Sequence, residues 1–202
     1  MAQKPRAPRE RRPAPAPTEQ VLRNAALYYL SRYAATEAGV RAVLLRRIDR
    51  WAREAGNLGT DCDVVSATCA EARQAAGRIA QSLAAAGAVD DQAFALSRAR
   101  SLTRAGKSQR ATAAHLAAKG VPPGLIEQAG LRDAEAELAA ALIHARRRRV
   151  GPFAVTPMDA DKLRRAMASL ARAGFSGGVA HRALRMSQDE AEALINALRS
   201  AL

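Results

Sequence analysis

The sequence predicts an all-α protein, an elongated tandem array of three three-helix repeats with a disordered basic N-terminal arm and an extra C-terminal helix. Prolines are frequent up to Pro17 and then absent until Pro122, so nothing interrupts helices between them. The same stretch is rich in alanine, leucine and arginine, which favour helix. A Leu-x-x-x-Gly helix ending, followed by an apolar residue, occurs at residues 83–87, 116–120 and 170–174. Its recurrence predicts a repeat array, with chance as the alternative.

The first segments are an arm and a first repeat. Residues 1–17 combine proline, alanine and arginine without an apolar face, which predicts a disordered basic arm. In the first repeat, residues 18–89, a helix starts at Thr18 and a second helix is capped by Thr36 and closed by Gly56. A linker from residue 57 then runs into a third helix that ends near residue 87, with a weak apolar pattern.

The second repeat, residues 90–132, contains the stretch "SLTRAGKSQR", which invites a nucleotide-binding interpretation. A phosphate-binding loop requires G-x-x-x-x-G-K-[ST] after a buried strand. Here Ser101 occupies the first glycine position, and an alanine- and arginine-rich helical pattern precedes it. We therefore expect a helix that ends near Ala105, with Gly106 as its C-cap and Ser108 as the N-cap of the next helix.

The third repeat, residues 133–186, is expected to open with a helix from Asp133 that runs into the arginines at 146–149. Thr156 and Pro157 are then expected to start the next helix, as its N-cap and first residue. The C-terminal helix, residues 187–202, begins with Ser-Gln-Asp-Glu, which is the pattern of a capping box.

The composition indicates a polyanionic partner. Lys and Arg number 32 against 19 Asp and Glu, so the formal net charge is +13. No apolar run is long enough to span a membrane, and the basic N-terminus has no apolar segment like that of a secretory signal. Cys62 and Cys69 lie seven residues apart, too far for a disulfide within one helix. These features predict a cytoplasmic protein.

The chain is not expected to be an enzyme, and no cofactor, metal or catalytic residue is predicted. His115, His144 and His181 lie on separate predicted helices, and no zinc, hydrolase or dinucleotide-binding motif occurs. The acidic residues fall mainly at helix starts, where they offset the helix dipole. An ATP hydrolysis assay on the isolated protein would test this expectation.

Clustered basic residues are the candidate binding site, because neighbouring arginines repel each other and gain nothing from packing together. A solvated helix face is the alternative for any single cluster. The scarcity of exposed-looking aromatics argues against base stacking as the main contact and favours backbone or acidic-surface recognition. The candidates are Arg98, Arg100, Arg104, Lys107, Arg110, Arg146, Arg147, Arg148, Arg149, Arg164 and Arg165.

Residues 89–121, "VDDQAFALSRARSLTRAGKSQRATAAHLAAKGV", resemble the middle repeat of the RecX family, regulators of the RecA recombinase. The segments "RRRRVGPF" and "LARAGFSGGVAHRAL" resemble its last repeat. "ALYYLSRYAATEAGVRAVLLRRI" resembles the first repeat more loosely, followed by an insertion at about residues 50–73.

The resemblance implies a curved array that binds in the groove of the RecA–DNA filament and modulates, usually inhibits, its strand exchange and ATPase. It connects the chain with DNA repair, homologous recombination and the SOS response, and transfers no catalytic residue. We expect a monomer that binds single- or double-stranded DNA weakly and in a salt-dependent way. Charge alone would equally support a general basic DNA-binding protein that contacts the phosphate backbone without sequence preference.

Overall fold

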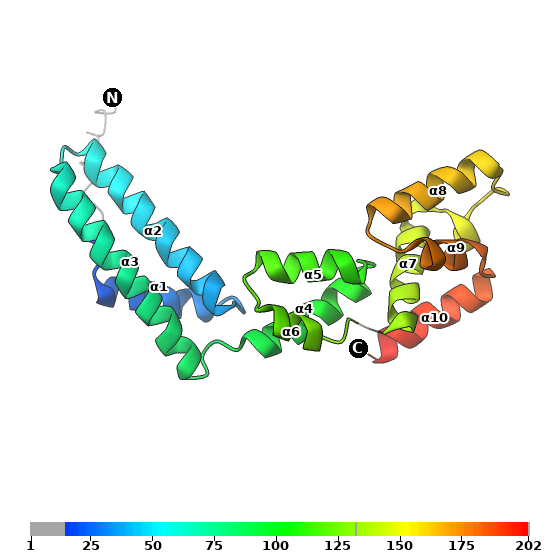
Figure 1. Cartoon of the computed structure of the whole chain (residues 1–202), viewed down its shortest axis with the longest axis horizontal. Coiled ribbons are helices and arrows are strands. Elements are labelled where there is room, and N and C mark those ends of the chain that lie inside the picture. Colours follow the sequence, from blue (N-terminus) through cyan, green and yellow to red (C-terminus); the bar gives the residue numbers. More distant parts are fainter. Residues whose placement is uncertain (1–14, 132, 202) are drawn as a thin grey trace, which may run out of the picture. The chain divides into compact units, whose positions relative to one another are not determined.

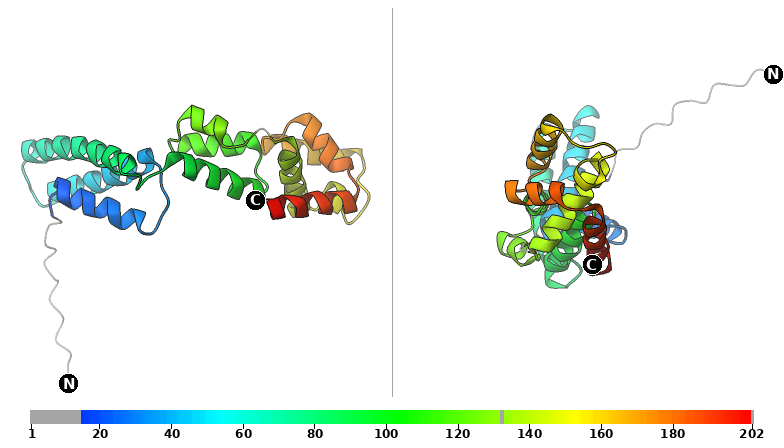
Figure 2. Two further views of the ribbon diagram at one scale, coloured as in Figure 1. Left: turned by 90° about the horizontal axis from the view of Figure 1, so that it is seen from below. Right: turned by 90° about the vertical axis from the view of Figure 1, so that its right-hand side faces the viewer.

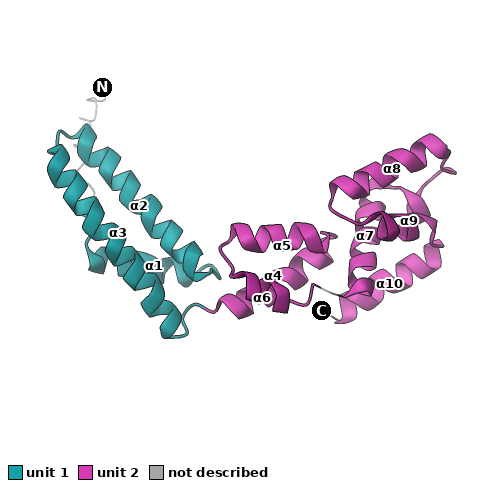
Figure 3. Ribbon diagram, viewed as in Figure 1, with its two compact units in different colours: residues 1–89 teal, residues 90–202 magenta. Residues whose placement is uncertain are grey.

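The structure, a computed structural model, describes residues 15–131 and 133–201. Over these ranges it is helical and contains no strand, which confirms the predicted all-α class (Figure 1). The chain divides into two compact units, residues 1–89 and 90–202, called unit 1 and unit 2 (Figure 3). Most of the predicted disordered arm, residues 1–14, lies outside the described residues.

Unit 1 consists of α1 (Glu19–Leu30), α2 (Glu37–Asn57) and α3 (Cys62–Ala85). The helices α2 and α3 lie side by side in both views (Figures 1 and 2). The three helices enclose one apolar core in which Leu22, Leu44, Ile48 and Ile79 are fully buried. Pro17 is buried as well, so ordered packing begins one residue before the Thr18 cap of α1.

The expected linker after residue 57 is largely helix, because α3 already begins at Cys62. The carboxylate of Asp61 starts α3 by accepting hydrogen bonds from the backbone N–H groups of Asp63 and Val64 at 2.8 and 3.3 Å. Alanines fill much of the buried side of α3, which made its apolar pattern weak in the sequence. Residues 50–73, where the resemblance implies an insertion, form the end of α2, the short connection and the start of α3.

Unit 2 begins with α4 (Asp91–Arg104), α5 (Gln109–Ala118) and α6 (Pro123–Gln128). Asp90 caps α4, and Ser108 caps α5 as predicted. These helices share a small core made of Ala95, Ala99, Leu116, Val121 and Ala129. Because this core buries little apolar area, it stabilises the three helices only weakly. Their stability therefore depends on contacts with the rest of unit 2.

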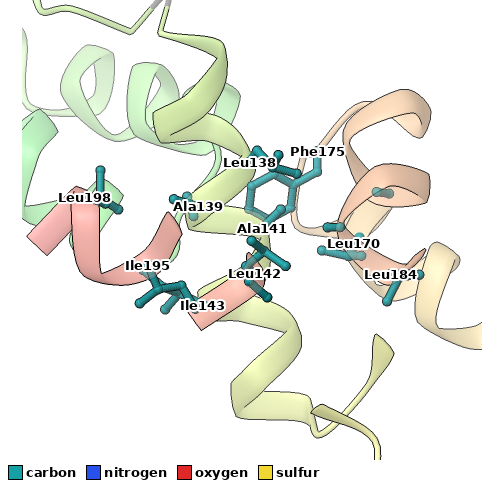
Figure 4. Close-up of a cluster of buried hydrophobic side chains, with 14 of the residues drawn as sticks. Leu138, Ala139, Ala141, Leu142, Ile143, Leu170, Phe175, Leu184, Ile195 and Leu198 are labelled. Atoms are coloured by element: carbon teal, nitrogen blue, oxygen red, sulfur yellow. The ribbon is translucent and has the colours of Figure 1, made fainter. Parts of the chain in front are cut away.

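The remainder of unit 2 surrounds α7 (Ala134–Arg148). It comprises a 3₁₀ helix, η1 (Gly151–Phe153), then α8 (Ala160–Arg172), α9 (Gly177–Arg185) and α10 (Gln188–Ala201). Consecutive residues of α7 from Leu138 to Ile143 are buried, so the helix is covered on more than one side. Figure 4 shows Leu170 and Phe175 on one side of α7 and Ile195 of α10 on another. The C-terminal helix is thus part of the core of unit 2.

The two predicted helix starts in this region have different outcomes. The capping box before α10 is confirmed, because Ser187 Oγ accepts from Glu190 N at 3.3 Å and Glu190 Oε2 accepts from Ser187 N at 3.2 Å. The start at Thr156 and Pro157 is wrong. The carboxylate of Asp159 accepts from Lys162 N at 2.7 Å, so α8 begins three residues later, after a loop.

Candidate functional site

All the candidate basic residues lie in unit 2, and each is exposed except the half-buried Arg146. They are carried by α4, the turn between α4 and α5, α5 itself, the end of α7, and α8. How these segments pack therefore decides which charges come together.

The Gly-Lys-Ser turn is an interhelical turn, as predicted, and it packs directly on α7. Gly106 is buried and has a positive φ of 70°. A Cβ at this position would lie 2.8 Å from Ile143 Cγ2 and 3.2 Å from the carbonyl oxygen of Ala140. Only glycine fits here, because both the backbone conformation and the close approach exclude a side chain.

Ser108 fixes the same turn to the loop between α8 and α9. Its fully buried hydroxyl accepts a hydrogen bond from Ala111 N at 3.2 Å and donates one to the carbonyl oxygen of Ala173 at 2.7 Å. Gly174 has a φ of 93°, and a Cβ there would lie 2.6 Å from Ser108 Oγ. Two glycine-containing turns, one from each repeat, therefore contact each other without space between them.

A buried carboxylate adds a further link between the repeats. Glu137 of α7 is only 9% exposed, and its Oε2 accepts from the backbone N–H of Gln109 at 2.8 Å. The Gln109 side chain in turn donates to the carbonyl oxygen of Asp133 at 2.8 Å. Burial raises the pKa of Glu137, and the hydrogen bond from Gln109 partly opposes that rise. The start of α5 is thereby held against the first turns of α7.

This packing assembles what we call the junction cluster: Lys107, Arg147 and Arg148. Arg147 Nη1 donates to the carbonyl oxygen of Ala105, at the end of α4, at 2.6 Å. Burial, and then the charges of Arg148, Lys107 and Arg147, lower the pKa of His144, which lies about one turn before Arg147 and Arg148 on α7. Within the described chain, no carboxylate forms a salt bridge with any of them. Three close, uncompensated cations favour an anionic partner.

A basic cavity next to the junction cluster is lined by the end of α7, the following segment and α8. It has a volume of about 490 Å³. Its basic lining consists of Arg148, Arg149, Lys162, Arg165 and Arg172. Arg148 belongs to both sites and connects them.

Lys162 and Arg172 were not among the residues chosen from the sequence. They stand three positions before and seven positions after Arg165, a spacing that places all three on one side of α8. Helical spacing was therefore a usable signal for both.

Arg149 ends α7 in a left-handed conformation, with φ 55° and ψ 48°. Among the described residues other than glycine, it alone has a positive φ. This conformation costs about 1–2 kcal/mol for a residue with a Cβ. Glycine would adopt this conformation with less strain.

Several candidates lie outside these two sites. Arg98 is turned about 200° from Arg100 around α4, and its Nε donates to His115 Nε2 on α5 at 3.0 Å. Burial, then Arg98 and Lys119, lower the pKa of His115. Arg164 forms an exposed salt bridge of 3.0 Å with Asp161.

The remaining candidates show no such side-chain partner among the residues that the structure describes. Arg100 and Arg104 are exposed on one side of α4, and Arg146 is half-buried on α7. Arg110 lies beside Gly174, because a Cβ added to that glycine would be 3.5 Å from the Cβ of Arg110.

Unit 1 corrects one expectation from the sequence. Tyr28 and Tyr33 are 62% and 58% exposed, and the guanidinium of Arg32 lies 4.5 Å from the Tyr28 ring centroid. Exposed aromatics are therefore present, and their scarcity cannot be used against base stacking in this unit.

Other classes of site find no support in the described residues. No group of three or more His, Cys, Asp or Glu side chains there could hold a metal ion. No helix in the same ranges is long and apolar enough to cross a bilayer.

Comparison with known proteins gives consistent matches. Residues 90–129 match the family model for the second three-helix domain of RecX. Regulatory protein RecX of Myxococcus xanthus is 39% identical over 168 residues, covering 81% of this chain and 83% of the relative. Regulatory protein RecX of Agrobacterium fabrum is 33% identical over 184 residues, covering 89% and 92%.

A solved structure agrees in fold. The crystal structure of RecX from Lactobacillus salivarius superposes with a TM-score of 0.54 at 19% identity, covering 89% of this chain and 97% of that one. At this identity the likeness concerns the fold alone. The matches cover 83% and 92% of the lengths of the two sequence relatives. Both relatives are named regulatory proteins, which favours regulation over catalysis. The chain belongs to the RecX family of regulatory proteins.

Proposed function

We propose that this protein binds the filament that RecA forms on DNA and inhibits its strand exchange and ATPase activities during DNA repair and the SOS response. It acts as a monomer in the cytoplasm, without a cofactor and without chemistry of its own. Membership of the RecX family supports the regulatory role, and the resemblance of its repeats to regulators of RecA supports the choice of partner.

The junction cluster is the observation that carries this proposal. Lys107 and Arg147 come from different repeats, yet hydrogen bonds and two glycine turns hold those repeats together. The charges are therefore already placed, and binding an anionic surface costs little ordering of the backbone. A filament offers DNA phosphates and protein carboxylates together, and simultaneous contacts to both raise the overall affinity.

General binding to the DNA backbone is the second candidate function. The net charge of +13 and the basic cavity on α8 favour it. Such binding needs only phosphates, so it should be as tight on bare DNA as on a filament.

A direct comparison of the two ligands separates these functions. The labelled protein is titrated with single-stranded DNA alone and with the same DNA covered by RecA, and fluorescence anisotropy gives each dissociation constant. The filament is expected to bind more tightly and to lose ATPase activity as it becomes saturated. Equal affinities would contradict filament regulation and leave general DNA binding.

Paired variants then test the site. We expect Lys107→Gln with Arg148→Gln to weaken filament binding and relieve ATPase inhibition, because both cations lack a described carboxylate partner. The matched control is Arg73→Gln with Arg78→Gln in unit 1, where each arginine forms a salt bridge. Each pair lowers the formal net charge of +13 by two. Equal weakening by both pairs would mean that total charge, not this cluster, governs binding.

A second variant tests α4. Replacing Arg100, Arg104 and Lys107 together with alanine should weaken filament binding while the helix content stays constant. All three side chains are exposed, and alanine favours helix. Unchanged filament affinity in this variant would remove α4 from the proposed interface.

A further inference from the structure

The basic cavity of unit 2 lies between the end of α7, the segment 150–158 and α8. Its volume of about 490 Å³ falls within the range of small-molecule sites. The walls have two chemical characters. Basic side chains and the apolar residues Val150, Ala154, Val155, Met158 and Ala166 both line the cavity, and Val155 is 85% exposed.

The basic lining is largely uncompensated. Among the described residues, no salt bridge involves Arg148, Arg149, Arg165 or Arg172. Lys162 has only a long contact of 3.9 Å with the exposed carboxylate of Asp159. Guanidinium groups bind phosphate oxygens in pairs of parallel hydrogen bonds, so several arginines around one cavity suit a phosphate well.

The walls are held in place by the fold itself. The thioether of Met158 accepts a hydrogen bond from Gly151 N at 3.3 Å, which ties the two ends of the loop together. Val150 and Met158 also pack against the core of unit 2. On the opposite side, Ser169 Oγ lies 3.5 Å from His144 Nε2. The part of the wall formed by Val150 and Met158 is thus fixed before a ligand enters, which lowers the entropy cost of binding.

The strained end of α7 fits the same interpretation. Arg149 keeps a left-handed backbone conformation at the point where the chain enters the cavity wall. Glycine would adopt this conformation with less strain, whereas the guanidinium of Arg149 adds a positive charge to the lining.

We propose that this cavity binds one nucleotide, with its phosphate on the arginines and its sugar or base against the apolar lining residues. The proposal goes beyond filament regulation, because the site lies within unit 2 and needs no RecA. For a DNA strand it rests on the second candidate function and names the site that would hold one unit of the strand. The nucleotide can be a free mononucleotide or one unit of a single DNA strand. Both present anionic phosphate oxygens next to a sugar and base, as a phosphomonoester in the first case and a phosphodiester in the second. An acidic peptide is disfavoured, because its carboxylates come without a sugar or base to contact the apolar lining residues.

Methyl-labelled full-length protein is titrated with thymidine 5′-monophosphate, a short oligothymidylate, thymidine, inorganic phosphate and a glutamate peptide, and followed by NMR. We expect the methyl signals of Val150, Val155 and Met158 to shift with the two nucleotide ligands. Tighter binding of the oligonucleotide identifies a unit of single-stranded DNA as the ligand, and tighter binding of the monophosphate identifies a free nucleotide. Phosphate or the peptide binding as tightly as the monophosphate, or no shift with either nucleotide ligand, overturns the proposal.

Two neighbouring arginines of α8 provide the matched variants. Arg165 lines the cavity, whereas Arg164 forms a salt bridge with Asp161 outside it, and both are exposed. Arg165→Gln should lower the affinity for the preferred nucleotide ligand about tenfold, because a charged hydrogen bond is lost. Arg164→Gln should change the affinity by less than about twofold.

For the oligonucleotide, Arg165→Gln should also reduce the slope of log K against log salt by about one. Equal effects of the two variants would overturn the proposal. Circular dichroism melts verify that both variants fold. Since no RecA is present, a failed nucleotide titration leaves the filament comparison untouched, and a failed filament comparison leaves this one untouched.

Discussion

The contact between Ser108 and Gly174 gives the sharpest test of the junction in unit 2. Ser108→Ala removes the N-cap of α5, which costs about 1 kcal/mol. It also takes from the Ala173 carbonyl a hydrogen bond of 2.7 Å, a loss of about 1–2 kcal/mol for a partly buried acceptor. We expect a total loss of about 2–3 kcal/mol in the stability of unit 2.

Gly174→Ala should be destabilising for two other reasons. The φ of 93° disfavours any side chain, and the new Cβ would lie 2.6 Å from Ser108 Oγ. Backbone strain costs about 1–2 kcal/mol, and overpacking adds about 1–3 kcal/mol. When both substitutions are combined, the hydroxyl is gone and the nearest Ser108 atom is its Cβ, 3.7 Å away. The double variant should therefore lose about 1–3 kcal/mol less than the sum of the single variants.

Urea unfolding followed by circular dichroism measures these losses, with hydrogen exchange of α5 and α8 to locate them. Trp51 is the single tryptophan and packs against the core of unit 1, so its fluorescence follows that unit. Its transition should keep its midpoint in all three variants. If the loss of stability in the double variant equals the sum of the two single losses to within about 0.5 kcal/mol, the contact between the two turns is refuted.

Three further predictions concern charge. Affinity for bare DNA should fall steeply with salt, with little base preference, because counterions are released at phosphate contacts; an affinity that barely changes between low and physiological salt would contradict this. The pKa of His144 lies below its usual 6.5, so the unfolded chain takes up a proton first and unit 2 should lose stability as pH falls below 6.5. Bound DNA should raise the pKa of His144 in an NMR titration, and a lower pKa on binding would contradict the junction cluster. Arg149→Gly should leave the melting temperature equal or higher while weakening nucleotide binding, and a lower melting temperature would remove the case for backbone strain.

The sequence predicted best those features that depend on residues a few positions apart. The Gly106 C-cap, the Ser108 N-cap and the Ser187 capping box all use contacts within one turn, so the local residues determine them. The starts of α3 and α8 were predicted less well. Several residues before each helix can serve as a cap, and packing against neighbouring helices selects among them.

For the site, the sequence by itself determined which residues are charged, and the basic candidates chosen from it all lie in the second and third repeats. It could not group them. Arg147 joins Lys107 because α4 ends against α7, and Arg98 is separated because it faces α5. Lys162 and Arg172 enter the cavity only where segment 150–158 lies against α8. Charge is a property of each residue, but proximity between distant residues arises from the packing of helices, and only the tertiary structure decides it.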